Sequence, residues 1–342
     1  MKRTVRTQRT EGANHFLAPS KSLGYIKTGC TLLDLVIGGG LPLGRISNIV
    51  GDKSTGKTLF AIETATNFAK QYPNGRIWYR ESEAAFDEAY AEALGMPMKM
   101  VKFWPEDKSF ETVEDFFEDL IRQTNWCLKH NRPGLYVLDS LDALSDRKEM
   151  ARNISDNTYG QDKSKQMSQL FRRLIRKIRN ANMHVIIISQ VRSNIGVSFG
   201  RKTTRSGGKA LDFYASFVMF LAHMETLYKK SRGQRRAVGV RIRAKADKNK
   251  VGLPFRECDF TIRFGYGIDD VKANLDFLKS AKRLKTVGLK GPAGMEDLLE
   301  KMDSMSNDEY RKSARDIKRA VVAAWKELDV EFLPKRKKYS DG

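Results

Sequence analysis

Residues Gly51-Asp52-Lys53-Ser54-Thr55-Gly56-Lys57-Thr58 match the pattern G-x-x-x-x-G-K-[ST] and form the most informative segment of the chain. A β-prone run, Ile46–Val50, precedes this segment, and an apolar pattern with helical spacing over residues 57–71 follows it. A strand, a glycine-containing loop and a helix N-terminus together bind anions, because backbone N–H groups and the helix dipole converge there. The segment therefore predicts a phosphate-binding P-loop, and a surface glycine turn is the weaker alternative.

Each residue type in this loop has a physical role. Gly51 and Gly56 let the backbone turn tightly and approach phosphate groups without a Cβ in the way. Lys57 would place a positive charge against the β- and γ-phosphates, and the Thr58 hydroxyl is an oxygen ligand suited to Mg²⁺. We therefore expect all eight residues of the loop to contribute to binding a nucleoside triphosphate with Mg²⁺.

Two further strand-like runs end in carboxylates. Gly134–Asp139 is apolar and ends in an acid, the Walker B arrangement, so Asp139 is expected beside the P-loop, supporting Mg²⁺ through water. The run Arg76–Tyr79 continues into Glu81 and Glu83, which face the same way on a strand, so one of them could orient or deprotonate an attacking water. A buried strand that ends in Asp by chance and a solvated acidic loop are the respective alternatives.

The composition favours a globular protein with an anionic partner. The 342 residues are 41% hydrophobic, enough for one large core and a smaller appendage. The net charge of +21 favours nucleic acid as a partner over the alternative of a generally basic surface. Three widely spaced cysteines and four scattered histidines predict reduced thiols in a cytosolic compartment and no zinc site. No apolar run approaches the length of a membrane span, and the basic start lacks the apolar segment of a secretory signal.

The pattern along the chain predicts three regions. Residues 1–25 form a polar, basic arm, which we interpret as an oligomerisation arm, with a disordered tail as the alternative. Residues 26–268 alternate strands and helices, which predicts an α/β core with a mostly parallel sheet flanked by helices. Residues 269–342 are expected to form a small, helical, basic C-terminal region, in which the capping box Ser306-Asn307-Asp308-Glu309 starts an amphipathic helix.

The core is expected to alternate parallel strands with helices. The parallel strands are Ile46–Val50, Arg76–Tyr79, Met100–Trp104, Leu135–Leu138 and Val185–Ser189. The helices are 57–71, 84–94, 110–129 and about 162–180. Strands near 216–224, 236–246 and 256–264 come without helices between them, so we expect an antiparallel extension of the sheet.

Several segments of residues 26–264, read in order, resemble the core of the RecA family of recombinases. The similar segments are Ile26-Lys27-Thr28-Gly29, Gly39-Gly40-Leu41-Pro42-Leu43-Gly44-Arg45, the P-loop, Glu83-Ala84-Ala85-Phe86-Asp87-Glu88-Ala89-Tyr90, and residues 189–200 with 207–216. The resemblance implies a RecA-like P-loop ATPase core that binds ATP. It further implies that Glu83, rather than Glu81, is the catalytic carboxylate, and that Asp87 and Tyr90 contact the adenine.

The most specific match is Gln190-Val191-Arg192-Ser193-Asn194-Ile195-Gly196-Val197-Ser198-Phe199-Gly200, which is similar to the family's second DNA-binding loop. Its glycines let backbone N–H groups approach phosphates, and its cations can replace the counterions of a nucleic acid. Ile195 is an apolar tip that could wedge between bases, and Gln190 could report the nucleotide state to the loop. A flexible basic surface loop is the alternative. The expected DNA-binding residues here are Arg192, Ile195, Gly196, Phe199, Arg201, Arg205, Gly207, Gly208 and Lys209.

The resemblance also places a first DNA loop at about Arg147–Tyr159. This loop leads into a helix with apolar residues on one side and cations on the other. Family residues that match Lys165, Ser168 and Arg172 of this helix approach the DNA.

Lys248 and Lys250 resemble paired lysines that reach the nucleotide of a neighbouring subunit, where a cation stabilises charge on the transferring phosphoryl group. An exposed basic turn is the alternative.

The chain departs from the family pattern at three places: the short basic N-terminal arm, Asp212 where a lysine is common at the interface, and a basic tail, Lys335–Lys338, in place of an acidic one. We interpret the basic tail as a sign of easier loading on duplex DNA, and the short, divergent build as a sign of a phage or plasmid recombinase.

Together these interpretations predict a DNA-dependent ATPase that forms filaments on single-stranded DNA and catalyses homologous pairing and strand exchange in recombination and repair. The expected cofactors are ATP and Mg²⁺. The expected partners are single-stranded DNA, duplex DNA, further copies in a helical filament, and single-strand-binding and loader proteins, in the cytoplasm of a bacterium or phage-infected host and without a membrane. The assigned catalytic residues are Glu83, Lys57, Gln190, Lys248 and Lys250, and the metal-binding residues are Thr58 and Asp139. The alternatives are a ring-forming helicase motor with a RecA fold and a mediator that binds ATP without hydrolysing it.

Overall fold

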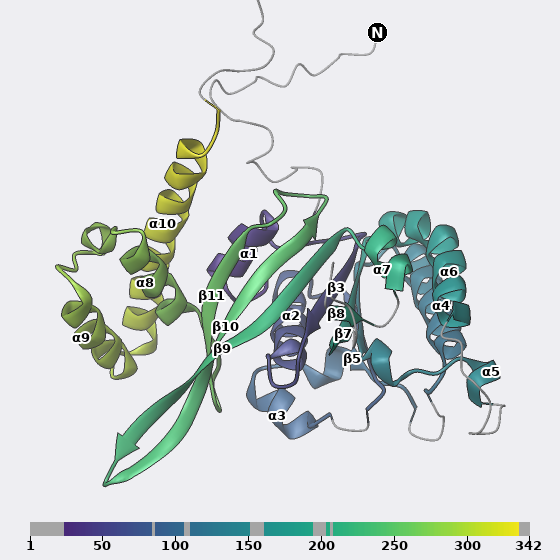
Figure 1. Ribbon diagram of the computed structural model, residues 1–342, viewed down its shortest axis with the longest axis horizontal. Coiled ribbons are helices and arrows are strands. Elements are labelled where there is room, and N and C mark those ends of the chain that lie inside the picture. Colours follow the sequence, from purple (N-terminus) through teal and green to yellow (C-terminus); the bar gives the residue numbers. More distant parts are fainter. Residues whose placement is uncertain are drawn as a thin grey trace, which may run out of the picture.

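The computed structural model describes residues 24–83, 86–105, 110–150, 161–193, 203–205 and 208–334. Within them, one large sheet crosses the molecule in the order β12-β11-β10-β9-β3-β7-β6-β4-β5, and β8 pairs with β7 (Figure 1). This arrangement confirms the predicted α/β core with a mostly parallel sheet. Expectations for residues 1–23 and 335–342, including the arm and the basic tail, concern residues outside those described.

The parallel half of the sheet centres on β3 (Ile46–Gly51), in which every residue is buried. β3 lies between β7 (Met183–Ser193) and β9 (Phe217–Ser231) and runs parallel to both. Beyond β7, the parallel order continues through β6 (Gly134–Asp139), β4 (Arg76–Glu81) and β5 (Val101–Lys102). Helices cover both faces, which is why the central strands are apolar on both sides.

Side chains that alternate along these strands build two cores. Val137 belongs to a cluster with α1 and α2, whereas Leu138, the next residue, belongs to a cluster with α4 and α6. Successive side chains of a strand point to opposite faces, so the two clusters lie on opposite sides of the sheet. The covering helices are α1 (Thr31–Ile37), α2 (Lys57–Gln71), α4 (Val113–His130), α6 (Gln161–Asn180) and α7 (Gly208–Tyr214).

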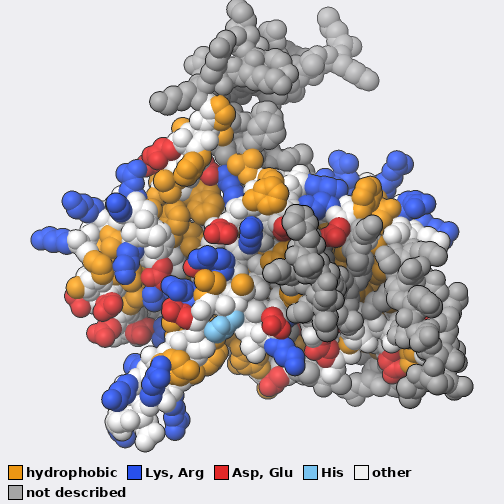
Figure 2. Space-filling model, in the orientation of Figure 1, with side chains coloured by type: hydrophobic (Ala, Val, Ile, Leu, Met, Phe, Trp, Pro, Cys, Tyr) orange, Lys and Arg blue, Asp and Glu red, His pale blue; other side chains and the backbone are white. Residues whose placement is uncertain are grey.

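The antiparallel extension is also confirmed, and it is longer than predicted. β9 pairs with β10 (Gln234–Asn249), which pairs with β11 (Glu257–Arg263) and then β12 (Gly267–Asp269). The outer parts of β9 and β10 leave the body of the molecule as a two-stranded ribbon (Figure 1). Figure 2 shows Lys and Arg side chains around the tip of this ribbon.

The C-terminal helices pack against the core and share one of its buried apolar clusters. Ile317, Val321 and Ala324 of α10 join the same buried cluster as α1 and α2. The capping box predicted at Ser306 and Glu309 is confirmed, with both reciprocal bonds present. The helices of this module are α8 (Asp270–Ser280), α9 (Pro292–Asp303) and α10 (Asn307–Glu331).

Three predicted boundaries differ from the structure, two of them because a capping side chain decides where a helix begins. α3 (Glu88–Ala93) starts after Asp87, whose side chain accepts from the backbone N–H of Tyr90, and not at residue 84. α4 starts after Thr112, which forms a capping box with Asp115, and not at residue 110. The strand predicted over 100–104 is reduced to β5, because a 3₁₀ turn over Met98–Met100 precedes it.

Short elements complete the described chain. They are β1 (Tyr25–Ile26), β2 (Leu41–Pro42), β8 (Thr203–Arg205), α5 (Arg147–Met150), and 3₁₀ turns over Leu141–Ala143 and Leu284–Val287. Among the described residues, none of the helices is long and apolar enough to cross a membrane.

Candidate nucleotide site and DNA-facing surface

The predicted P-loop joins the end of β3 to the start of α2, as the sequence indicated. Gly56 is the N-cap of α2 with φ of 81°, and a Cβ at this position would clash with Cδ1 of Ile262. A Cβ at Gly51 would lie 2.9 Å from the carbonyl oxygen of Leu221. Space therefore requires glycine at both ends of the loop, and the left-handed backbone requires it at Gly56 as well.

Lys57 folds back onto its own loop. Its Nζ donates a hydrogen bond of 2.7 Å to the carbonyl oxygen of Asp52. Burial lowers the pKa of Lys57, and the nearby carboxylates of Asp139 and Glu83 oppose that shift. The ammonium group is thus held at the mouth of the loop, where a phosphate would replace the carbonyl as its partner.

Asp139 meets the P-loop at the end of β6. Its Oδ2 accepts hydrogen bonds from Thr58 Oγ1 and from the hydroxyl of Tyr79, both at 2.8 Å. Asp139 is 7% exposed, and burial raises its pKa, while the two hydroxyl donors act in the opposite direction. The structure thus brings the two predicted metal-binding residues, Thr58 and Asp139, into contact.

This donor set fits Mg²⁺ rather than an ion that needs an all-protein cage. The described residues contain no group of three or more His, Cys, Asp or Glu side chains that could enclose a metal. Mg²⁺ keeps several waters and binds through one or two protein oxygens together with substrate phosphates. One hydroxyl and one carboxylate beside a phosphate-binding loop are the ligands that such a site requires.

Glu83 is the centre of a second cluster at the same edge of the sheet. Its Oε1 accepts a hydrogen bond of 2.6 Å from Ser140 Oγ and one of 3.2 Å from Gln190 Nε2. Its backbone N–H donates to Oε1 of Glu81 at 2.7 Å. The two acids therefore have different partners: the Glu81 carboxylate accepts from the backbone, whereas the Glu83 carboxylate accepts from Gln190.

Two residues of this cluster were not expected from the sequence. Ser140 donates to Glu83, and its backbone N–H donates to Ser82 Oγ at 3.0 Å. Asp142 Oδ2 accepts from the backbone N–H of Gln190 at 2.6 Å. The signal that could have indicated them is a hydroxyl and an acid directly after the strand that ends at Asp139.

Asp87 and Tyr90, the predicted adenine contacts, lie at the start of α3. The Asp87 carboxylate caps this helix through the backbone N–H of Tyr90 at 2.9 Å. The ring of Tyr90 is 39% exposed, and partial burial and the charge of Glu63 on α2 raise the pKa of Tyr90. α3 thus presents an exposed aromatic ring close to the helix that follows the P-loop.

Lys248 and Lys250 lie at the opposite end of the sheet from the P-loop. Lys248 pairs with Val218 at the start of β9, and the Lys250 backbone N–H donates to the carbonyl of Ser216, whereas the P-loop follows the other end of β3. Both Nζ atoms donate to the carbonyl of Phe213 at the end of α7, at 3.0 Å from Lys248 and 3.4 Å from Lys250. Within one chain these lysines do not join the Glu83 cluster.

The residues predicted to bind DNA lie partly outside the described ranges. Ile195, Gly196, Phe199, Arg201 and Gly207 are outside them. Arg192 and Arg205 lie on the antiparallel pair β7 and β8, and Gly208 and Lys209 open α7. This pair of strands begins directly after Gln190, so the described backbone connects the Glu83 cluster to the predicted second DNA loop.

α6 has the amphipathic character predicted for the helix after the first DNA loop. Lys165 lies in its first turns, Ser168 is half-buried and Arg172 is exposed. The buried side is apolar, and the exposed side carries the cations Arg172, Arg173, Arg176, Lys177 and Arg179. Of the predicted first loop, the described part is α5, and residues 151–160 are outside it.

A family model for the RecA N-terminal domain matches residues 15–269. The chain belongs to the RecA family. It is 34% identical to the protein RecA of Synechocystis over 266 residues, which cover 78% of this chain and 70% of that protein. It is 33% identical to the protein RecA of Clostridioides difficile over 271 residues, covering 77% and 74% of the two chains.

Membership of the RecA family confirms the predicted function at the level of the family. The chain is a RecA-type recombinase of recombination and repair, and a DNA-dependent ATPase. ATP binding, DNA binding and filament formation are properties of the RecA family. The ring-forming motor and the non-hydrolysing mediator are not favoured.

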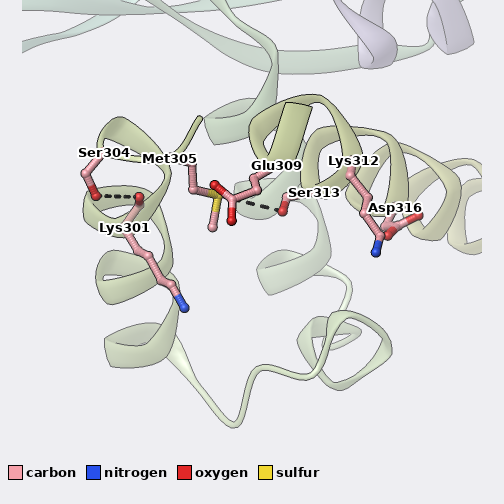
Figure 3. A pocket seen from close by; sticks show the side chains of 7 residues that line it. All are labelled: Lys301, Ser304, Met305, Glu309, Lys312, Ser313 and Asp316. Atoms are coloured by element: carbon pink, nitrogen blue, oxygen red, sulfur yellow. Dashed lines mark hydrogen bonds between the residues drawn. The ribbon is translucent and has the colours of Figure 1, made fainter. Parts of the chain in front are cut away.

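A cavity of about 440 Å³ lies in the C-terminal module, away from this RecA-type site (Figure 3). It is open and lies where α9 meets α10, and its lining is mostly polar and charged. The lining residues are Lys301, Ser304, Met305, Glu309, Lys312, Ser313 and Asp316. Glu309 already forms the capping box with Ser306, so this cavity is not a candidate nucleotide-binding site.

Proposed function

We propose that ATP binds at the P-loop between adjacent protomers of a filament on single-stranded DNA, and that its hydrolysis accompanies homologous pairing and strand exchange. The observation that supports this most directly is the hydrogen bond between Gln190 and Glu83. It links the carboxylate beside the phosphate-binding loop to the strand that continues toward the second DNA loop. A nucleotide-dependent change at Glu83 would therefore be transmitted to the DNA-facing segment.

The P-loop and its neighbours would bind the triphosphate. The backbone N–H groups between Gly51 and Thr58 would hold the phosphates, and Lys57 would exchange its bond to the Asp52 carbonyl for a phosphate oxygen. Thr58 and Asp139, already in contact, would hold Mg²⁺. Mg²⁺ would neutralise charge on the phosphate oxygens when bound.

Glu83 is the proposed catalytic carboxylate, and its surroundings suit that role. The hydroxyl of Ser140 fixes the carboxylate by a short hydrogen bond, and the neutral amide of Gln190 adds a second. In this position Glu83 would orient the attacking water and accept its proton. Lys248 and Lys250 would come from the adjacent protomer, because they lie at the far end of the sheet in their own chain.

The DNA-facing surface is proposed to consist of the second loop and one side of α6. Backbone amides of Gly196, Gly207 and Gly208 and the cations of the loop would bind phosphates. Arg172 on the exposed side of α6 would extend this surface, together with Lys165 and Ser168. Asp87 and Tyr90 of α3 would contact the adenine.

We also propose that the protein acts in the cytoplasm of a bacterium or phage-infected cell with single-strand-binding and loader proteins. The support for a reducing compartment is that Cys30, Cys127 and Cys258 are all free and buried.

A steady-state ATPase titration with single-stranded DNA, combined with electron microscopy, tests the proposed function. We expect hydrolysis to rise with added DNA and open helical filaments to form with ATP and Mg²⁺. The variant Glu83→Gln should form nucleotide-bound filaments but hydrolyse ATP about 100-fold more slowly or worse. Closed rings, or a Glu83→Gln variant with normal turnover, would contradict the proposal.

A further inference from the structure

The ribbon formed by residues 222–238 has no described role in the ATPase site. Among the described strands, β9 beyond Leu221 pairs with β10 alone, and β10 before Gly239 pairs with β9 alone. Residues 228–237 are all exposed, so among the residues that the structure describes nothing covers the side chains of this part of the ribbon. A two-stranded ribbon that projects this far without a core of its own is an element available for a partner.

The outer part of the ribbon is strongly and uniformly basic. Residues 226–238 contain five cations and no acidic residue. The described residues place no carboxylate in ion-pair contact with these cations, and the acid nearest along the strand, Glu225, pairs with Arg241 instead. The five cations are Lys229, Lys230, Arg232, Arg235 and Arg236.

The cross-strand register sets like charges directly against each other. Lys230 lies opposite Arg235, and Lys229 lies opposite Arg236. Directly opposed like charges destabilise an antiparallel pair, so this arrangement costs the isolated ribbon stability. A bound polyanion would remove the repulsion.

The same register distributes the cations over both faces of the ribbon. Opposed residues share a face and successive residues alternate, so one pair lies on each face. The tip adds a fifth cation, because Arg232 and Gly233 form the connecting turn with φ of 47° and 76°. These left-handed values are those of a type I′ turn, whose twist matches that of the paired strands.

The side chain of Arg235 is held in one orientation by an aromatic ring. The guanidinium carbon of Arg235 lies 3.8 Å from the centroid of the Tyr228 ring, on the same face of the ribbon. Stacking of this kind holds the planar group in place and leaves its edge free to bind a phosphate through two N–H groups.

We propose that the ribbon of residues 222–238 enters a groove of duplex DNA. The major groove of duplex DNA admits a two-stranded β-ribbon and is flanked by two phosphate strands. Cations on both faces of a ribbon would meet the two strands, whereas contact with a single flat surface would use only one face. The site is distinct from the loops assigned above to single-stranded DNA, and it rests on the proposed function only in taking nucleic acid as the partner.

The test is the variant Lys229→Gln/Lys230→Gln/Arg235→Gln/Arg236→Gln, compared with a control that loses the same charge elsewhere. The control is Lys70→Gln/Lys99→Gln/Lys129→Gln/Arg132→Gln, four exposed cations on the core. Affinity for a fluorescent blunt-ended duplex is measured between about 50 and 200 mM salt. Hydrolysis stimulated by single-stranded DNA is measured for all three proteins, so that a failed ATPase proposal and a failed ribbon proposal can be told apart.

We expect the ribbon variant to lose about tenfold or more in duplex affinity, and the slope of log K against log salt to fall by about 3 to 4. Its stimulated hydrolysis and the duplex affinity of the control should match the wild type. Unchanged duplex affinity and slope in the ribbon variant would overturn the proposal, as would an equal loss in the control.

A partner of another class would also overturn the proposal. The exposed acids Glu296 and Glu300 lie four residues apart on α9, so a second copy of the chain could offer the ribbon an acidic face. In that case the ribbon variant would keep its duplex affinity but lose self-association measured without DNA. The reversal Glu296→Lys/Glu300→Lys, combined with Lys229→Glu/Lys230→Glu, would then restore self-association.

Discussion

The side chain of Gln190 donates a hydrogen bond to the carboxylate of Glu83 across 3.2 Å, although 107 residues separate them in the chain. Gln190 is at the same time anchored through its backbone N–H to Asp142. The amide of Gln190 therefore contacts the nucleotide site, while its backbone belongs to the strand that leads to the second DNA loop. This is the property expected of a residue that couples a nucleotide site to a neighbouring loop.

The variant Gln190→Ala should uncouple DNA from hydrolysis. It removes the bond to Glu83 but leaves the carboxylate and its Ser140 partner in place. A hydrogen bond to a charged group is worth about 1.5 kcal/mol or more, so stimulation by single-stranded DNA should fall by about tenfold or more. Basal hydrolysis without DNA, measured in the same assay, should stay close to wild type. Loss of basal hydrolysis to the level of Glu83→Gln would show that Gln190 acts in the chemical step instead.

Ser140 is expected to position Glu83, and Ser140→Ala should slow hydrolysis about tenfold without weakening ATP binding. The reason is the loss of a 2.6 Å hydrogen bond to the carboxylate, again about 1.5 kcal/mol. Ser47→Ala is the matched control, since Ser47 Oγ is buried in β3 with no hydrogen-bond partner among the described residues. A Ser140→Ala protein with the turnover and the ATP affinity of that control would remove Ser140 from this role.

Lys248 and Lys250 should act across the protomer interface, which a mixing experiment can detect. Lys57→Ala and Lys248→Ala/Lys250→Ala should each be inactive alone, because every site then lacks the P-loop lysine in the first variant and both lysines of the neighbour in the second. In mixed filaments, some interfaces combine the intact P-loop of one variant with the intact lysines of the other. Stimulated hydrolysis should therefore reappear on mixing, up to about a quarter of the wild-type rate if the two variants assemble at random. Complete inactivity of mixtures that still form filaments would place the lysines outside the site.

The nucleotide side of the site was largely predictable from the sequence, because its determinants are local. The P-loop glycines are required by the space around them, and Gly56 also by its left-handed backbone, while Asp139 is brought to Thr58 by the shared edge of parallel strands. The contact between Ser140 and Glu83 was not predictable, because it depends on how the ends of β4 and β6 approach each other. Membership of the RecA family indicates what these residues do, whereas only the structure shows which atoms they contact.

The length of the β9–β10 ribbon was missed for a different reason. Strand prediction relies on the alternation of apolar and polar residues on a half-buried sheet, and the ribbon has no buried face beyond Leu221. Its residues are held by backbone pairing and a tight turn, neither of which leaves an apolar pattern. The bounds of α3 and α4 were missed because single capping side chains, Asp87 and Thr112, outweigh the periodicity around them.

Glu63 should make the stability of the fold depend on pH between about 4.5 and 7. It lies where α2 meets β12, and its Oε1 accepts from the backbone N–H of Ile268 at 2.6 Å. Burial raises the pKa of Glu63 from 4.5 to about 7 in the folded chain. The folded state therefore keeps a proton that the unfolded chain has lost, so stability falls as pH rises through this window.

The variant Glu63→Gln keeps the acceptor for Ile268 but cannot ionise. Near pH 4.5 its free energy of unfolding should be close to that of the wild type, and at pH 8 it should be higher by on the order of 3 kcal/mol. Urea unfolding at both pH values measures the difference, and Glu296→Gln on the exposed face of α9 serves as a control that should follow the wild type. If Glu63→Gln and the wild type lose stability in parallel between these pH values, another buried carboxyl is responsible. Asp34, whose pKa burial raises to about 6, is the next candidate, and Asp34→Asn should then flatten the lower part of the same window.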